Sequence, residues 1–256
     1  MSKKSGLGAQ GYVGGYDITN DIGQMDGMDE SVSLLEVTGM DKSAVERVRG
    51  PKSGRFAFTG FFNDAALREH AALSGLPTTD VVCIFLTSST LGDEGVGITG
   101  KQINYAWNRP ADGSLGISAE VLGNGDGLNW GKSLTAGKKT DSAAANGTGV
   151  NFAEQPKGAA TSSAFGLVAY LEVFAFTGTN VTVTIEESDD DGSGDAYAAV
   201  TGGVFTAASG ITAERIETSL SLTVEQYLRA VTSGTFSNAV FAVVCKRYAS
   251  ANAERE

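Results

Sequence analysis

The sequence predicts an all-β protein with mainly antiparallel strands and one short helix. Apolar and polar residues alternate with a period of two along many short segments, and turn-forming residues separate these segments. Within 181–186, for example, Val181, Val183 and Ile185 share one face of a strand, while the polar residues between them share the other. The 34 glycines and 4 prolines among 256 residues fit a chain with many turns.

The C-terminal half is expected to hold two antiparallel hairpins. Residues 165–176 are apolar on both faces, which is typical of a strand in the middle of a sheet. Thr-Gly-Thr-Asn at 177–180 predicts a hairpin turn between this strand and the next, because Gly and Asn tolerate positive φ angles. The second hairpin is expected to have strands over 227–231 and 239–245, with its turn at 232–238.

The N-terminal half is expected to combine five strands with one convincing helix. The helix begins at Asn63 or Asp64, either of which can cap its first free amides, and it ends at Ser74 before Pro77. A weaker helix is expected over 41–47. The strands are expected over 31–38, 55–62, 80–87, 101–107 and 116–122.

A glycine-rich segment predicts a division into two domains. Gly-Asn-Gly-Asp-Gly at 123–127 is typical of a turn or hinge. We therefore expect one domain over 1–128 and a second over 129–256. The second domain is expected to begin with an exposed loop over 138–149.

The charge argues against a nucleic-acid-binding role. The 19 basic and 30 acidic side chains give a net charge of −11, and attraction to phosphate needs the opposite sign. The N-terminal Met-Ser-Lys-Lys-Ser-Gly has no apolar stretch behind it, so neither a secretory signal nor a membrane insertion is expected. These features predict a protein that is made and folded in a cytoplasm.

The residue types needed for catalysis are scarce, so no enzyme is expected, and no catalytic, cofactor or metal site. His70 is the only histidine, and no nucleophile with a base can be assembled around it. Cys83 and Cys245 lie in apolar segments and are expected to be buried free thiols. Paired carboxylates of a glycosidase leave no spacing signature, and they stay open as an alternative.

Several motifs have both a functional and a structural interpretation. The acidic segment 189–195 offers oxygen ligands for calcium, but Ala198 stands where a helix-loop-helix site needs its bidentate acid. A solvated acidic turn is favoured, with calcium binding as the alternative. The glycines of 6–11 and 123–127 predict turns, because neither segment continues into a phosphate-binding helix.

Four aromatic residues are candidates for a sugar-binding platform, although at least two of them are expected to pack in the cores. They are Tyr105, Trp107, Trp130 and Tyr170.

Segments of both halves resemble tailed-bacteriophage proteins. In the first half, the segments that resemble phage tail proteins are 12–22, 35–47, 60–63, 76–80 and 101–105. In the second half, the segments that resemble outer β-sandwich modules of phage virion proteins are 130–131, 134–138, 169–179, 183–185, 214–216, 227–231 and 234–236. The resemblance covers nearly the whole chain, and the motifs that carry it are residues typical of packing and of turns.

This resemblance implies a major tail tube protein located in the virion tail. It implies a tail-tube-like β-sandwich or barrel, followed by a jelly-roll-like β-sandwich that decorates the outside. Copies would form hexameric rings that stack into a tube, and some acids of the first domain would line the bore. The tape measure protein and genomic DNA would pass through the lumen without specific binding.

Other virion roles are the alternatives to the tube. They are a capsid decoration protein, or a baseplate or minor tail protein whose second domain binds a host-surface glycan or another receptor. For the tube, a long loop over 40–52 and a flexible start over 1–10 are the expected contacts between stacked rings, because extended segments gain buried area without a second core. The predicted helix is expected to cover one face of its sheet.

Overall fold

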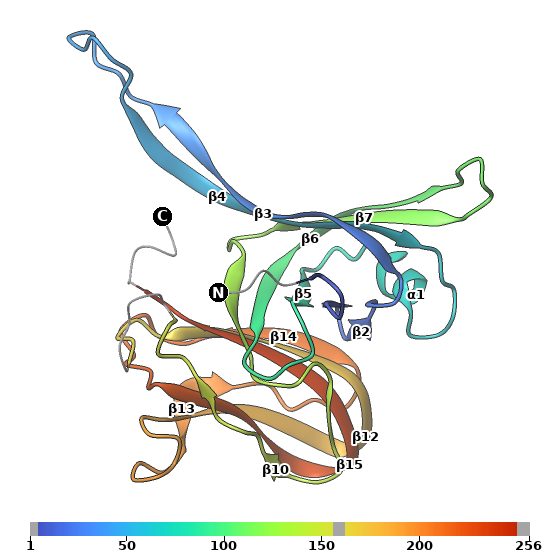
Figure 1. The fold of residues 1–256 in the computed structure, drawn as a ribbon, viewed down its shortest axis with the longest axis vertical. Coiled ribbons are helices and arrows are strands. Elements are labelled where there is room, and N and C mark those ends of the chain that lie inside the picture. Colours follow the sequence, from blue (N-terminus) through green and yellow to red (C-terminus); the bar gives the residue numbers. More distant parts are fainter. Residues whose placement is uncertain (1–4, 156–161, 250–256) are drawn as a thin grey trace.

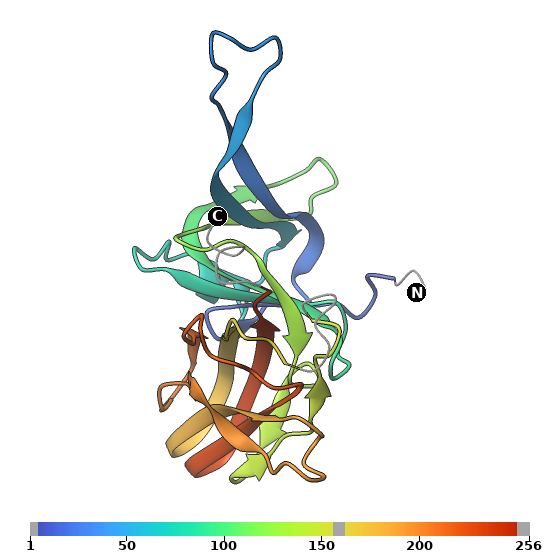
Figure 2. The same cartoon turned by 90° about the vertical axis from the view of Figure 1, so that its left-hand side faces the viewer.

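The computed structural model describes residues 5–155 and 162–249. These residues form fifteen strands, all joined into one hydrogen-bonded network, and one short helix. The strand pairs are antiparallel, which confirms the predicted all-β class. A first part, residues 5–128, lies above a second part, residues 129–249, in Figure 1 and again in the rotated view of Figure 2.

The elements have the following bounds: β1 (Gln10–Val13), β2 (Tyr16–Asp17), β3 (Ile22–Glu36), β4 (Arg47–Phe61), α1 (Glu69–Leu73), β5 (Val81–Leu86), β6 (Glu94–Asn108), β7 (Gly116–Gly123), β8 (Asn129–Ser133), β9 (Lys139–Asp141), β10 (Ala145–Asn146), β11 (Val150–Asn151), β12 (Leu167–Ser188), β13 (Ala198–Val204), β14 (Thr212–Glu217) and β15 (Tyr227–Arg247). No helix in the described residues is long and apolar enough to cross a membrane.

The first part is built on the strand order β3-β4-β7-β6. β5 pairs with the N-terminal half of β6. Inward-facing residues of these strands fill its core, among them Phe56, Phe58, Ile98, Ile117 and Val121. The predicted strands over 80–87 and 116–122 match β5 and β7 closely. Those predicted over 31–38, 55–62 and 101–107 are pieces of much longer strands.

The segment between β3 and β4 differs from its prediction. Residues 37–46 form the tip of a hairpin, and β4 begins at Arg47. The helix predicted over 41–47 is therefore wrong, and the loop predicted over 40–52 is correct for 40–46 but wrong for 47–52. Cross-strand bonds extend to the tip, where the Val37 amide donates to the Glu46 carbonyl at 3.0 Å. These pairings prevail over the local preference of a segment too short to sustain a helix by itself.

The helix α1 is shorter than predicted and begins later. Leu67 has a φ of 64°, a left-handed conformation that interrupts any helix starting at Asn63 or Asp64. The Asn63 side chain instead accepts a hydrogen bond from the Ala65 amide at 3.1 Å, so it caps the preceding turn. Leu73 then anchors the helix in the core of the first part.

The second part is organised by two long strands that pair over their whole length. β12 and β15 run side by side from Leu167↔Arg247 to Ser188↔Tyr227, so the hairpin turns predicted at 177–180 and 232–238 are wrong. The glycines at these places instead bend the strands, with φ angles of 152° at Gly178 and 117° at Gly234. Residues suited to a turn are equally suited to such a bulge.

Both halves of β12 contribute to one core because of this bend. Val173 before the bend and Val181 after it belong to the same buried cluster, which β15 completes with Phe241 and Val243. β12 pairs with β15 along its length and also with β13 and β14, which confirms the prediction of a central strand. The segment predicted as a loop over 138–149 contains β9 and β10, which pair with β15.

Candidate assembly surfaces and the junction between the two parts

The most prominent feature of the first part is an extended hairpin, residues 31–53, which we call the arm. It projects at the upper left of Figure 1. β7 pairs with β4 only from Arg55 to Phe61, so the arm beyond that point is a two-stranded ribbon. Such a ribbon is marginally stable in water unless it packs against something else.

The arm has one apolar face without a cover. The register places Leu35 opposite Val48, and Val37 follows two residues after Leu35 on the same side. These side chains are 52%, 46% and 51% exposed, and Met40 at the tip is fully exposed. A contiguous exposed apolar group of this kind is typical of an interaction surface.

The arm also carries positive charge in an acidic chain. This charge lies on β4, where residues 47–53 contain three basic and no acidic side chains, whereas the whole chain has a net charge of −11. Arg55 pairs with Glu120 at 2.5 Å. Within the described residues, no carboxylate pairs with Arg47 or Arg49, so these two guanidinium groups are available to an acidic partner.

Both ends of the sheet β3-β4-β7-β6 have a strand edge without a neighbour. Among the described residues β3 pairs only with β4, and β6 pairs only with β7 beyond Lys101. Such edges present unpaired backbone groups to another strand. The sheet can therefore be extended from either end by a second chain.

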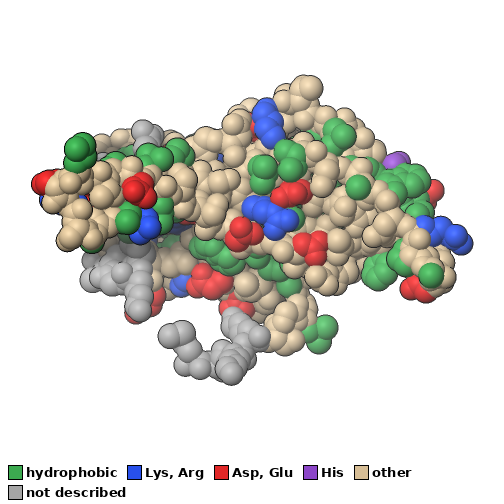
Figure 3. All heavy atoms as spheres, turned by 90° about the horizontal axis from the view of Figure 1, so that it is seen from above, with side chains coloured by type: hydrophobic (Ala, Val, Ile, Leu, Met, Phe, Trp, Pro, Cys, Tyr) green, Lys and Arg blue, Asp and Glu red, His purple; other side chains and the backbone are tan. Residues whose placement is uncertain are grey.

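A second apolar surface lies at the end of this sheet that is remote from the arm, and we call it the α1 surface. It comprises Leu67 and Trp107, which are 50% and 56% exposed. Phe61 is 61% exposed but lies on the opposite face of the sheet, because Gly60 and not Phe61 is aligned with Ile117 and Trp107. The Trp107 ring packs against Phe62 with centroids 4.8 Å apart. Viewed from above, Figure 3 shows hydrophobic side chains at both ends of the first part.

Polar contacts beneath the α1 surface hold it in place. Glu69 accepts hydrogen bonds from the Asn63 amide at 2.6 Å and the Tyr105 hydroxyl at 3.1 Å. His70 Nδ1 lies 2.9 Å from the same hydroxyl. Burial raises the pKa of the Glu69 carboxyl. These hydrogen bonds fix α1 and Tyr105 beside the exposed ring of Trp107, which lies 6.0 Å from the His70 ring.

The two parts meet through a third apolar cluster. Tyr12 and Ile84 of the first part pack there with Val168, Phe174 and Val244 of the second. The rings of Tyr12 and Phe174 make an edge contact at 4.7 Å. β8 also joins the parts, because it pairs with both β6 and β15. The junction is thus continuous in its core and in its backbone hydrogen bonding.

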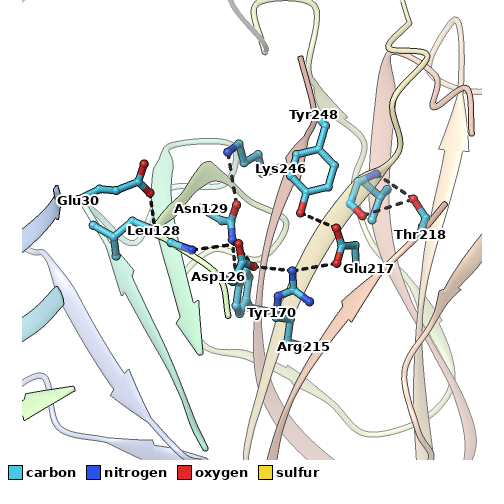
Figure 4. A network of polar contacts seen from close by, with 12 residues as sticks. Glu30, Asp126, Leu128, Asn129, Tyr170, Arg215, Glu217, Thr218, Lys246 and Tyr248 are labelled. Atoms are coloured by element: carbon cyan, nitrogen blue, oxygen red, sulfur yellow. Dashed lines mark hydrogen bonds and ion pairs between the residues drawn. The ribbon is translucent and has the colours of Figure 1, made fainter. Parts of the chain in front are cut away.

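A polar network crosses the same junction (Figure 4). Arg215 donates to Asp126 at 2.5 Å and to Glu217 at 3.1 Å, and Glu217 accepts from the Tyr248 hydroxyl at 3.0 Å. Asn129 continues the network with a 3.0 Å bond to Asp126. Arg215 on β14 therefore contacts a turn of the first part, and Glu217 of the same strand extends the network to Tyr248, just after β15.

Glu172 is a buried acid at this junction. Its Oε2 accepts a hydrogen bond from the Gly15 amide, which belongs to the turn between β1 and β2. Its Oε1 has no hydrogen-bond partner among the described residues. Burial raises the pKa of the Glu172 carboxyl well above its ordinary value, although bonds from backbone amides oppose the shift.

A cleft of about 1020 Å³ opens beside the network. Side chains of both charges line it, including Lys52, Asp80, Asp126, Arg215 and Glu217. Arg215 pairs with Asp126 and Glu217, and Asp80 pairs with Lys101 at 2.8 Å. The cleft therefore lacks a concentration of one charge that would select a ligand.

The acidic segment predicted as a turn binds its own backbone. The Asp190 carboxylate accepts hydrogen bonds from the amides of Ser193, Gly194 and Asp195. These bonds lower the pKa of the Asp190 carboxyl, and the bond from the Asp195 amide has the largest effect. No cluster of three or more potential metal ligands is found in the described part of the chain.

The structure separates the four aromatic candidates for a sugar platform. Tyr105 and Trp107 flank His70. Tyr170 is buried at the junction, so its ring cannot stack against a sugar. Trp130 lies in β8 and is 43% exposed. Cys83 and Cys245 are buried and free, as predicted.

The apolar face of the arm and the buried acid of the junction were not predicted from the sequence. The alternation Arg-Val-Arg at 47–49 is a period-two signal for the arm. Glu172 stood out only as a charge in an otherwise apolar strand. Its partner turn lies 157 residues earlier, so local sequence gives no indication of the contact.

Comparisons with known proteins return phage tail structures. No protein-family model and no curated protein matches the chain. The crystal structure of the Dit protein of phage SPP1, described as a hub adsorption apparatus of Gram-positive-infecting phages, is similar over 93% of this chain and 99% of that one, with 11% identity and a TM-score of 0.35. The phage P2 baseplate in its activated conformation with Ca is similar over 95% of this chain and 100% of that one, with 11% identity and a TM-score of 0.32. Scores this low do not establish a shared fold.

Proposed function

We propose that this chain is a structural subunit of a bacteriophage tail and that copies of it associate into a closed ring. The resemblance of segments such as 12–22 and 101–105 to phage tail proteins supports the virion assignment. The observation that carries the ring is the pair of free edges on β3 and β6, at opposite ends of one sheet.

The placing of the two edges favours a head-to-tail contact. When the edge of β3 in one copy pairs with the edge of β6 in the next, each copy contacts one neighbour through β3 and the other neighbour through β6. Repeating this contact leads either to a closed ring or to an open filament. Closure leaves no edge uncovered, and it thereby prevents uncontrolled pairing of strands.

We assign the ring to the baseplate end of the tail in preference to the repeating tube. A tube of stacked rings needs matching surfaces along its axis as well as around the ring. In the described residues, the exposed large apolar side chains outside the arm and the α1 surface come from separate elements, as with Trp130, Val204 and Ile211. Such isolated residues give little basis for stacking.

The proposal assigns the chain no catalysis. Genomic DNA passes through the ring without being bound, and a net charge of −11 suits a surface along which DNA slides. The second part, joined to the first through the Arg215 network, forms a fixed outer module.

Electron microscopy of the purified full-length chain tests this proposal. We expect discrete rings at high protein concentration. Long stacked tubes would instead support the tube subunit, and particles that remain monomeric at every concentration would refute self-assembly. Mass photometry of the same samples gives the number of copies in each particle.

A further inference from the structure

We propose that Asn124 is a site of spontaneous modification, where conversion of the side-chain amide to a carboxylate weakens the polar link between the two parts. This inference does not depend on the ring proposed above. The sequence Asn-Gly, in which the glycine amide can attack the preceding side chain, occurs at 124–125 and at 146–147. The structure leaves the first of these places open to the reaction and protects the second.

The reaction needs only the chain itself and water. The main-chain nitrogen of the glycine loses its proton to hydroxide and attacks Cγ of the asparagine, which closes a cyclic imide. The bond from Cγ to Nδ2 breaks, and Nδ2 takes a proton from water and leaves as ammonia. Water then opens the ring to give aspartate, or isoaspartate, in which the main chain runs through the former side chain. Such an intramolecular attack is fast where the two reacting atoms can meet without strain.

The main chain at Gly125 is free to take part in this attack. Gly125 lies in the bend that connects β7 to β8. A Cβ atom placed there would have no heavy atom within 4 Å apart from its chain neighbours in the described structure. Among the described residues, no acceptor bonds the Gly125 amide. Asn124 is exposed, and both residues line the cleft of about 1020 Å³, so water reaches the site.

The second Asn-Gly pair is held in a sheet. Asn146 is exposed as well, but it belongs to β10 and pairs with Val231 of β15. The Gly147 amide donates to the Ala230 carbonyl at 2.9 Å, and a Cβ atom at Gly147 would stand 2.4 Å from the same oxygen. Attack by this amide would first have to break the hydrogen bond and move the chain away from β15.

The side chain of Asn124 stabilises its turn through a charged partner. Its Nδ2 donates to both carboxylate oxygens of Asp80, at 3.0 and 3.1 Å. Bonds from Lys101 and then from Asn124 lower the pKa of the Asp80 carboxyl, so this group is ionised at neutral pH. Conversion of Asn124 replaces the donor by a second carboxylate, and two like charges in contact repel each other.

The same turn carries the link to the second part. Asp126 accepts hydrogen bonds from Arg215 of β14 at 2.5 Å and from Asn129 at 3.0 Å (Figure 4). An isoaspartate at 124 lengthens the main chain two residues before Asp126, and repulsion from Asp80 displaces the turn. Both changes act on the carboxylate that Arg215 binds. The modified chain therefore has a weaker junction.

Peptide mapping by mass spectrometry tests the site. The purified full-length chain is incubated in mildly alkaline buffer, and conversion of each asparagine to an acid is followed over time. We expect Asn124 to convert about tenfold faster than Asn146 or more, which corresponds to protection of the second site by one main-chain hydrogen bond. In urea the two sites are expected to convert at similar rates.

Three results would overturn the assignment of the site. They are an Asn124 that stays unconverted in the folded chain, equal rates at Asn124 and Asn146 in the folded chain, and the same difference in urea as in the folded chain. The last result would make the local sequence, and not the fold, the cause of the difference. Asn124→Gln is the control, because its side chain is one methylene longer and closes the ring poorly, and no conversion is expected at this position.

A variant that mimics the product tests the consequence. Asn124→Asp is expected to unfold at a lower urea concentration than Asn124→Gln, because its carboxylate faces Asp80. Combining Asn124→Asp with Asp80→Asn exchanges the amide and the carboxylate, and it is expected to restore the midpoint. An Asn124→Asp chain as stable as Asn124→Gln, or a loss that Asp80→Asn does not relieve, would contradict the weakened link.

Discussion

The β12–β15 pair and the β3–β4 pair are both long antiparallel ribbons, but they differ in how far their apolar side chains are buried. Glycines with positive φ at Gly178 and Gly234 bend the first pair, and its two halves enclose a common core. No residue of β3 or β4 has a positive φ, and this pair runs on into the arm. The bent ribbon thus covers its own apolar face, whereas the apolar face of the unbent ribbon stays exposed in the arm.

The difference in burial predicts very different costs of removing an aromatic ring. Phe241→Ala in the core of the second part, where the side chain is 1% exposed, is expected to lower the free energy of unfolding by about 3–5 kcal/mol. Phe61→Ala, at a ring that is 61% exposed, is expected to change it by less than about 0.5 kcal/mol. Urea unfolding of both variants checks this contrast. Similar losses would show that the Phe61 ring contributes to the stabilising core despite its exposure.

Charged groups provide a second contrast, between the junction and the arm. Arg215→Ala removes a partly buried guanidinium that joins Asp126 to Glu217, and we expect a loss of about 1–3 kcal/mol. Lys42→Ala breaks an exposed pair with Glu46 in the arm, where a loss of about 0.5 kcal/mol or less is expected. Thermal unfolding of the two variants side by side measures the difference. An Arg215 variant as stable as the Lys42 variant would contradict the role of the network.

The pH dependence of stability sharpens the account of the junction. The pKa of Glu172 is raised in the folded chain, so the folded protein keeps this proton to a higher pH than the unfolded chain does. Its contribution to the free energy of unfolding is therefore fully present below the unfolded pKa of about 4.3 and is lost as pH rises through the folded pKa. The free energy of unfolding falls through this group by at most about 1.4 kcal/mol per pH unit.

Glu172→Gln removes this titration. Between pH 5 and pH 7, roughly the range above the unfolded pKa, the variant is expected to show a smaller decline of stability than the wild type. Urea unfolding at several pH values gives both curves, and Glu36→Gln at the exposed end of β3 is the control. Parallel curves for wild type and Glu172→Gln would mean that the carboxyl is already ionised in the folded protein.

The strands that pack one face against a buried core could be predicted from the sequence. The alternation of Val181, Val183 and Ile185 and the apolar segment 165–176 were placed correctly in β12. Turn chemistry misled the prediction at 177–180, since Gly178 serves as well in a bulge as in a hairpin. Local residues determine that the chain bends there, but only the pairing with β15 determines how.

The candidate surfaces were harder to predict, for a related reason. The arm has alternation on both strands but no core beneath it, so residues 40–52 fitted a long loop equally well. The α1 surface depends on the left-handed Leu67, a conformation that leucine rarely adopts and that no propensity indicates. Of the earlier candidates for ring contacts, residues 1–4 lie outside the described residues.

Sedimentation of a variant that alters only the apolar face of the arm tests the central claim most directly. The wild type is compared with the triple variant Leu35→Ser, Val37→Ser, Val48→Ser, and urea unfolding is measured on both. We expect ring-sized particles from the wild type and monomers from the variant, with the free energies of unfolding of the monomers equal within about 1 kcal/mol because these side chains are half exposed. A triple variant that sediments in rings like the wild type would contradict the account.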